Sequence, residues 1–329
     1  MKILMFLAFF FFHIVALGQE KHKTYHENGL VEEIGQYNAK GEKKGKWKRF
    51  YTNGTLQYTT TYKNGKQQGK WKEYFDNGIV SKSGNYQNDK RTGTWKNYNI
   101  DGVIIDIGAY ANGNKEGKWQ TFYTNGQLSE IGTYKNGMLI GTWKTYHENG
   151  QLSCTGRYES HEKKTGTWIR YYEHGALDWQ GQYENGLKTG KWLSYYKNGQ
   201  LASIEYFKAG KETGESKRYN TDGQLWISGR YEDGKQTGKW NWYHDNGKLK
   251  TTGNYNNGKS TGEWRGYHDN GQLAKVGQYD KNGKRTGTWK TYYSSGQLES
   301  SGASVNGEKV GEWQYYDEQG NLTNTKEEQ

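Results

Sequence analysis

Apolar residues along this chain recur at a fixed spacing and do not gather into long hydrophobic segments. From residue 47 onward a tryptophan stands every 24 or 25 residues, and one position in this phase, Ser216, carries serine instead. Tyrosine or phenylalanine follows each of these positions by three residues, and an aliphatic residue such as Leu128 or Leu152 comes later in each unit. Self-similarity at a fixed period indicates a repeat architecture.

A glycine stands two residues before the tryptophan position in all twelve units. Typical glycine and tryptophan pairs are Gly69 and Trp71, Gly93 and Trp95, Gly117 and Trp119, Gly141 and Trp143, Gly166 and Trp168, Gly190 and Trp192, Gly238 and Trp240, and Gly262 and Trp264. Because a glycine also precedes Ser216, the indole alone does not explain it. We predict that this glycine has a positive φ or lies against a neighbouring strand.

Two turn signals divide each unit. An Asn-Gly or Asp-Gly dipeptide follows the aromatic residues, as at Asn125-Gly126, and a second dipeptide closes many units, as at Asn136-Gly137. These dipeptides suit type I′ hairpin turns, in which both central residues have positive φ. Two turns per 24 residues therefore predict two antiparallel strands per unit.

Side-chain alternation sets the expected faces of these strands. It places four residues of one second strand on a common face: Leu128, Glu130, Gly132 and Tyr134. The bare glycine there leaves room for a ring from a neighbouring strand. Trp143 and Tyr146 are three residues apart and cannot share a face of a regular strand. Either a bulge separates them or the sheet buries rings on both faces.

The fold predicted from this pattern is all-β. We expect an elongated antiparallel β-meander, or solenoid, of about twelve stacked β-hairpin repeats over residues 25–322. Residues 19–24 are predicted to form a short leader, and residues 323–329 a polar tail. In such an array each unit packs only on its neighbours.

The N-terminal segment has the features of a secretory signal peptide. Lys2 provides a basic start, Ile3 to Leu17 is apolar except for one histidine, and small residues end at Gly18. We predict cleavage of residues 1–18 and export to the periplasm, the cell surface or the outside. A retained membrane anchor is the alternative, but fifteen residues is short for a span of roughly twenty.

Composition changes the picture of the core. Only 31% of the residues are hydrophobic, while 16% are aromatic, and the chain has 47 glycines and no proline. The core is therefore expected to consist of tryptophan and tyrosine rings. The alternative is that these rings form a sugar-stacking surface. Cys154 is the only cysteine, so no intrachain disulfide is possible.

The repeat resembles the bacterial MORN-repeat variant family. The unit written from this chain is G-x-W-x-x-Y-x-x-N-G-Q-L-x-x-x-G-x-Y-x-N-G-K, and residues 141–158 show it well. The resemblance covers residues 25 to about 322 and implies a meander of hairpins stacked side by side. Some members are described as antitoxin components, which fits poorly with a signal peptide. The local departures are Ser216, Thr60, Glu205 and Ser304.

No arrangement typical of catalysis or metal binding stands out. Four histidines follow the unit's tyrosine position, and they are His26, His147, His244 and His268. Only His244 and His268 belong to adjacent units, roughly 10 Å apart, whereas zinc–nitrogen bonds are about 2 Å long. The carboxylates form no recurring pair, and Cys154 reads as a packed thiol. We therefore expect no enzymatic activity, no metal and no cofactor.

The formal net charge is +11, and part of the excess forms a stripe. Seven basic residues stand directly after the tryptophan position, which should expose them on the opposite face: Lys48, Lys72, Lys96, Lys144, Lys217, Arg265 and Lys290. The stripe is either a solubilising face that also protects the strands or a track for anions.

The function expected from these features is that of an exported, non-catalytic repeat protein that serves as a protein-binding or scaffold surface. The alternative is a cell-envelope module that binds acidic glycans or anionic lipid through the basic stripe and exposed aromatic residues. Export argues against nucleic acid as the partner.

Overall fold

The computed structural model describes residues 21–159 and 163–328, so the predicted signal peptide at residues 1–18 lies outside the described residues. Every element of secondary structure in the described residues is a β-strand. The chain forms two compact units, one ending at Glu116 and the other beginning at Gly117.

The first unit holds the strands β1 (His22–Tyr25), β2 (Val31–Tyr37), β3 (Lys43–Phe50), β4 (Leu56–Lys63), β5 (Lys66–Tyr74), β6 (Val80–Gln87), β7 (Lys90–Tyr98) and β8 (Ile104–Ala111). The second unit begins within β9 (Asn114–Phe122) and continues with β10 (Leu128–Lys135), β11 (Met138–Tyr146), β12 (Leu152–Tyr158), β13 (Lys164–Tyr171), β14 (Leu177–Glu184), β15 (Leu187–Tyr195), β16 (Leu201–Lys208), β17 (Lys211–Glu212), β18 (Gly214–Tyr219), β19 (Leu225–Glu232), β20 (Lys235–Tyr243), β21 (Leu249–Asn256), β22 (Lys259–Tyr267), β23 (Leu273–Tyr279), β24 (Arg285–Tyr292), β25 (Leu298–Val305), β26 (Glu308–Tyr316) and β27 (Leu322–Glu328).

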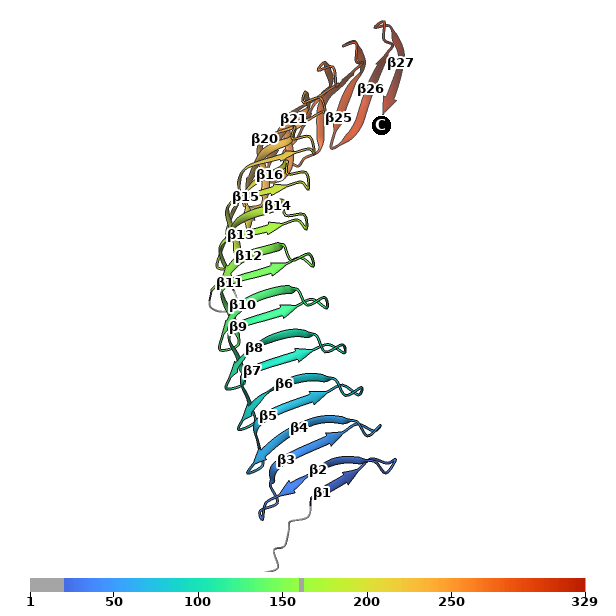
Figure 1. Ribbon diagram of the computed structural model, residues 1–329. Coiled ribbons are helices and arrows are strands. Elements are labelled where there is room, and N and C mark those ends of the chain that lie inside the picture. Colours follow the sequence, from blue (N-terminus) through green and yellow to red (C-terminus); the bar gives the residue numbers. More distant parts are fainter. Residues whose placement is uncertain (1–20, 160–162, 329) are drawn as a thin grey trace, which may run out of the picture. The chain divides into compact units, whose positions relative to one another are not determined.

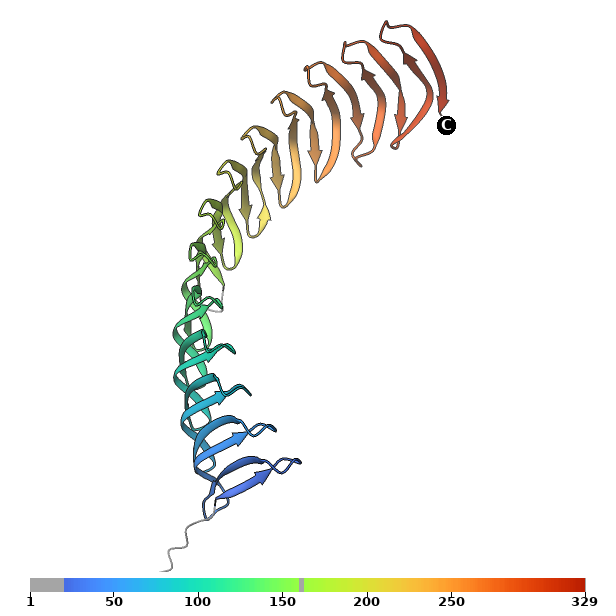
Figure 2. The ribbon, with the colours of Figure 1, turned by 45° about the vertical axis from the view of Figure 1, so that its right-hand side comes forward.

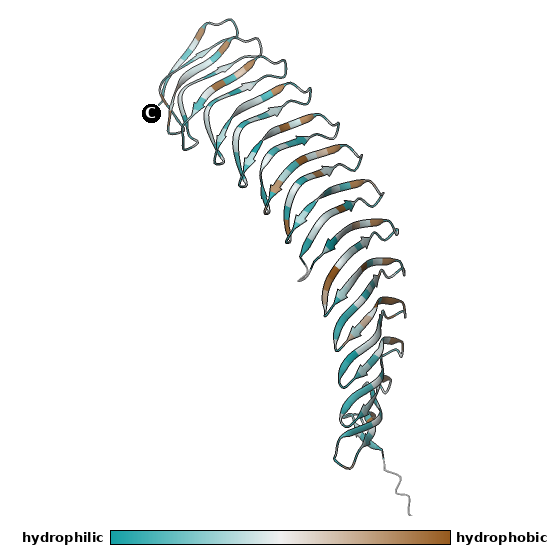
Figure 3. Cartoon of the chain, turned by 90° about the vertical axis from the view of Figure 1, so that its left-hand side faces the viewer, coloured by the Kyte–Doolittle hydropathy of each residue, from teal (hydrophilic) through white to brown (hydrophobic). Residues whose placement is uncertain are grey.

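Within each unit the strands pair antiparallel with their neighbours in sequence, for example β3 with β4 and β4 with β5 in the first unit. In the second unit β13 pairs with β14 and β14 with β15. Figures 1 and 2 show the resulting hairpins side by side within each unit. In Figure 3 apolar residues occupy only short stretches of the strands. The predicted antiparallel meander of hairpin repeats is confirmed.

Strands extend into the segments predicted as leader and tail. β1 starts at His22, inside the segment predicted as a leader. Residues 322–328, mostly predicted as a polar tail, form β27, which pairs with β26 although its side chains are mostly exposed. Each of these strands pairs with the edge of a neighbouring strand, β1 with β2 and β27 with β26. The pairing uses backbone amide and carbonyl groups, which every non-proline residue has whatever its side chain.

The two turns of a unit have different geometries. In the turn that closes the unit, Asn64 and Gly65 both have positive φ (50° and 76°), as predicted for type I′. In the other turn only the glycine does, as at Gly54 with φ 82°. There the Gly54 amide donates to the Tyr51 carbonyl oxygen at 2.9 Å, which makes a three-residue loop with a left-handed glycine at its end. The type I′ prediction is therefore wrong for this turn.

The glycine before each tryptophan lies in a bulge. Ile131 pairs with Lys144 and Thr133 pairs with Ile140, so the single residue between them faces three residues, 141–143. Gly141 adopts φ 69° there, and a Cβ added to it would have nothing within 4 Å. Of the two predicted causes, positive φ is therefore the one that requires this glycine.

Replacing Gly141 with alanine is expected to destabilise the protein by about 1–2 kcal/mol, the cost of a left-handed conformation for a residue with a Cβ. Gly141→Asn should cost less, because asparagine tolerates this region. The neighbouring Thr142→Ala is the control and should be nearly silent. Urea unfolding and hydrogen exchange measure the difference, and equal stability of all three variants would contradict the strain.

A second glycine, on the other strand of the hairpin, has a different cause. Gly181 has an ordinary φ, but a Cβ added to it would overlap the indole of Trp192 on the next strand. Gly156 meets Trp168 in the same way. The predicted room for a neighbouring ring is thus a slot that seats the tryptophan of the following hairpin.

Both alternatives raised for Trp143 and Tyr146 are present. The register shifts between Thr145 and Tyr146, where Tyr146 pairs with Leu152. The equivalent first-unit residues Phe50 and Tyr74 line pockets together with the lysines that follow the tryptophans, so rings lie on both faces. The shared face predicted for Leu128 and Gly132 is wrong, because a shift between Leu128 and Glu130 interrupts the alternation.

Candidate functional site

One face of the sheet carries the aromatic core. Eight of the tryptophans are at most 6% exposed: Trp47, Trp95, Trp119, Trp168, Trp192, Trp240, Trp289 and Trp313. Trp168 packs edge-on between Tyr158 and Tyr183, with ring centroids 5.1 and 5.9 Å away. Rings in this arrangement are occupied in packing, so they do not form a sugar-stacking surface.

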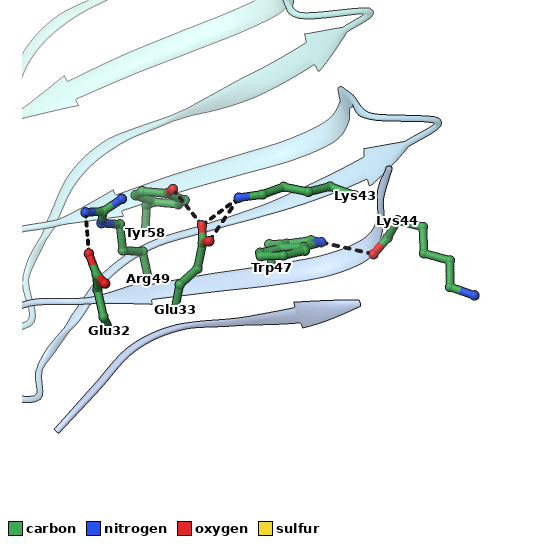
Figure 4. Close-up of polar contacts among 7 residues, drawn as sticks. All are labelled: Glu32, Glu33, Lys43, Lys44, Trp47, Arg49 and Tyr58. Atoms are coloured by element: carbon green, nitrogen blue, oxygen red, sulfur yellow. Dashed lines mark hydrogen bonds and ion pairs between the residues drawn. The ribbon is translucent and has the colours of Figure 1, made fainter. Parts of the chain in front are cut away.

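Cations cover several of these tryptophans. The Lys43 ammonium lies 3.9 Å from the Trp47 ring centroid and also contacts Glu33 at 2.8 Å (Figure 4). Equivalent residues cover other indoles, namely Arg91, Lys164, Lys188, Arg285 and Lys309. Sequence reasoning missed them, although a basic residue four positions before tryptophan was a readable signal of a cation–π contact.

On the opposite face of the first unit, three residues of the predicted basic stripe lie in one register row. Lys48 pairs with Thr59, Thr59 with Lys72, Lys72 with Ser83, and Ser83 with Lys96. The lysines are therefore two strands apart, roughly 10 Å. Lys48 and Lys72 are exposed and Lys96 is half-buried.

A second row runs beside the first. Lys46 and Lys70 are exposed and stand two residues before Lys48 and Lys72, so they point to the same face. We call these five residues, Lys46, Lys48, Lys70, Lys72 and Lys96, the basic face. None of them forms an ion pair with any described residue.

Shallow pockets lie between the rows of the basic face. One, of about 450 Å³, is lined by both lysine pairs together with Leu56, Thr59, Thr60, Thr61 and Tyr74. The next, of about 280 Å³, contains Lys70, Lys72 and Lys96 with Ser83, Asn85 and Tyr98. No carboxylate lines either pocket. Glu33 and Glu73 instead contact Lys43 and Lys82 at 2.8 and 3.2 Å.

In the second unit the stripe is interrupted or neutralised. Between Lys144 and Lys217 the equivalent row holds Ile169 and Leu193. Two of its cations have acidic neighbours on their own strand: Lys217 lies 3.5 Å from Glu215, and Arg265 lies 2.7 Å from Glu263. Lys290 is separated from Arg265 by Val276. The seven predicted residues therefore do not form one uniform surface.

The four histidines of the tyrosine-following position join successive repeats. The imidazole Nε2 of His147 donates to the Tyr171 carbonyl oxygen at 3.0 Å, and His26, His244 and His268 make the same contact one repeat further along. In other repeats a tyrosine hydroxyl does so, as Tyr123 does to Tyr146 at 2.6 Å. Histidine and tyrosine are interchangeable here because both present a donor at the required reach.

Cys154 is half-buried, and burial raises the pKa of its thiol above the ordinary value. A raised pKa lowers the thiolate fraction at neutral pH, which disfavours nucleophilic chemistry. Among the described residues no group of three histidine, cysteine or acidic side chains is arranged to hold a metal ion. Nor does the described part of the chain contain a helix that could span a membrane.

One repeat departs from the core pattern. Ser216 replaces tryptophan and is 3% exposed, and Glu205 replaces the slot glycine. Arg218 lies 3.5 Å from Glu205. Burial, and then the nearby Glu205, raise the pKa of Glu212. The strand is also interrupted at Thr213, between β17 and β18.

Comparison with solved structures finds weak likenesses to large toxin assemblies. The TcdB2-TccC3 crystal structure is 12% identical over 93% of this chain and 24% of that chain, with a TM-score of 0.17. The Tc holotoxin pore of Photorhabdus luminescens is 14% identical over 93% of this chain and 18% of that chain, also at 0.17. This chain thus spans less than a quarter of either. Among curated proteins no relative was found.

The family comparison agrees with the repeats in the structure. The model of the MORN repeat variant matches residues 43–64, 67–88, 115–136, 139–160, 188–209, 212–233, 236–257, 260–284 and 285–303. These nine segments cover more than half of the chain and follow its hairpins. The chain belongs to the MORN repeat variant family.

Proposed function

We propose that this chain is an exported, non-catalytic binding protein that presents the face of its sheet opposite the tryptophans to a partner. The observation that carries the proposal is the difference between the two faces. On the tryptophan face, rings, cations and carboxylates satisfy one another, as Lys43, Trp47 and Glu33 do. On the other face of the first unit, the five lysines of the basic face remain without ion-pair partners among the described residues.

The sequence and the geometry support binding better than catalysis. The pockets of the basic face are shallow and contain no carboxylate, histidine or thiol, the groups that most often act in acid–base or nucleophilic catalysis. The apolar N-terminal segment supports export. A protein partner is the leading candidate. An acidic glycan or an anionic membrane surface is the second, favoured by the unpaired lysines.

Site-specific photocrosslinking in cells tests the proposal. A crosslinking residue at Thr94, which is exposed beside Lys96 on the basic face, is expected to give a discrete adduct in the exported fraction. The matched position is Lys82, which contacts Glu73 on the tryptophan face and is expected to give none. Equal adducts from both positions, or a chain retained in the cytoplasm, would contradict the proposal.

A further inference from the structure

The basic face has an uncompensated charge concentrated in a small area. Four of its five lysines are exposed, and the described acidic residues of the neighbouring strands, such as Glu33 and Glu73, contact cations on the tryptophan face. Charges of one sign on a surface without counter-charges attract anions over several ångströms. The ligand of this face is therefore expected to be anionic.

The arrangement of the lysines favours a linear ligand that crosses the strands. Lys48, Lys72 and Lys96 repeat every second strand, roughly 10 Å apart, and neutral hydroxyl groups of Thr59 and Ser83 lie between them. A single small anion would use one interval. A polymer with regularly spaced negative groups would meet one lysine at each interval.

The groups between the lysines favour a sugar polymer. Thr59, Thr61, Ser83 and Asn85 line the pockets and can exchange hydrogen bonds with sugar hydroxyls. Tyr74 lines the pocket that contains Thr59 and Thr61, and the apolar face of its ring can pack on a sugar ring.

A membrane surface fits this face less well. Proteins that lie on a membrane insert large apolar side chains at the interface. The exposed large apolar side chains of the first unit, Tyr25, Leu30 and Ile100, do not line the pockets of the basic face.

We propose that the basic face of the first unit binds a linear acidic polysaccharide, with its carboxylate or sulfate groups on Lys48, Lys72 and Lys96 and its sugar hydroxyls on Thr59, Ser83 and Asn85. This inference rests on the proposed binding function and takes the acidic glycan, the second of the partners named there, as the ligand of the basic face.

Binding of residues 19–329 to defined probes tests the proposal. The probes are heparin and polygalacturonate as acidic polysaccharides, with dextran as the neutral control. The triple variant Lys48→Gln, Lys72→Gln, Lys96→Gln is expected to lose roughly tenfold or more in affinity, the combined effect of three charge contacts at the surface. The matched control, Lys40→Gln, Lys66→Gln, Lys90→Gln, removes the same charge from exposed positions in turns or at the strand ends next to them and should change affinity less than threefold.

Several outcomes would overturn the inference. Equal losses in the two triple variants would show attraction to net charge alone. Tighter binding to phosphatidylserine vesicles or to single-stranded DNA than to either polysaccharide would assign another ligand. Unchanged thermal unfolding of both variants excludes misfolding as the cause. If no polysaccharide binds while the Thr94 crosslink still captures a partner, the glycan inference fails and the proposed binding function stands.

Discussion

Replacing Gly181 with valine is expected to destabilise the second unit by about 3 kcal/mol, near the upper end of the usual cost of overpacking. A Cβ at this position would overlap the indole of Trp192. That indole cannot easily retreat, because Trp179 stacks on it at 5.3 Å and Tyr183 meets it edge-on at 5.1 Å. Since each hairpin packs only on its neighbours, the loss should be local.

Hydrogen exchange measures this effect repeat by repeat. Protection should fall in β14 and β15 and stay unchanged in β25 and β26. The control is Gln182→Val, which introduces the same side chain at the exposed neighbouring position. Similar stability of the two variants would show that the slot tolerates a side chain.

The chain itself contains a natural version of this substitution. Thr60 occupies the slot position of its hairpin and is 1% exposed. The following tryptophan, Trp71, is half-buried and stacks on Tyr58, with ring centroids 4.6 Å apart. A side chain at the slot position is thus accompanied by an indole that is more exposed than the eight most buried ones.

Restoring the pattern at the departing repeat is expected to stabilise the second unit by about 3 kcal/mol, the upper part of the range for burying a large side chain. The variant Glu205→Gly, Glu212→Lys, Ser216→Trp copies the preceding repeat, in which Gly181, Lys188 and Trp192 form the slot, the cation and the indole. The variant removes the carboxylates of Glu205 and Glu212 and adds an indole with a lysine beside it.

A mutant cycle shows whether these three positions act together. Ser216→Trp alone should give no stabilisation, because Glu205 has a side chain where the indole needs an empty slot. Non-additivity of the single and combined variants in urea unfolding is the expected sign of direct contact. Additive effects, or stabilisation by Ser216→Trp alone, would contradict the slot model.

Most of the fold was predictable because the chain repeats itself. The period, the two strands per unit and the antiparallel pairing all follow from comparing one unit with the next. The side on which each residue lies was harder to predict. A register shift such as the one between Leu128 and Glu130 reverses the alternation, and nothing in the local residue types marks it.

The geometry of the turns was also not predictable from the residue types alone. Asn-Gly at residues 64–65 and Asn-Gly at residues 53–54 look alike in sequence but adopt different geometries. The difference comes from loop length, which is set by where the flanking strands resume pairing. In the second geometry the asparagine acts through its side chain: Asn53 Oδ1 accepts a hydrogen bond from the Thr55 amide at 2.9 Å.

The candidate site was only partly visible in the sequence. The position after tryptophan includes Lys48, Lys72 and Lys96, which share a register row. It also includes Lys217 and Arg265, which form ion pairs with the acidic residues two positions earlier in the sequence. Lys46 and Lys70 stand two residues earlier and lie outside this pattern, but a strand presents every second residue to the same face.

The side-chain hydrogen bonds from Tyr123 to Tyr146 and from His147 to Tyr171 both run toward the C-terminus, and each links one repeat to the next. A duplicated unit would therefore contain both the side chain that donates to the next repeat and the backbone carbonyl oxygen that accepts from the preceding one. A gene encoding such an array can gain or lose whole copies by unequal recombination without any compensating change at the junctions. The length of the protein is consequently open to selection separately from its fold.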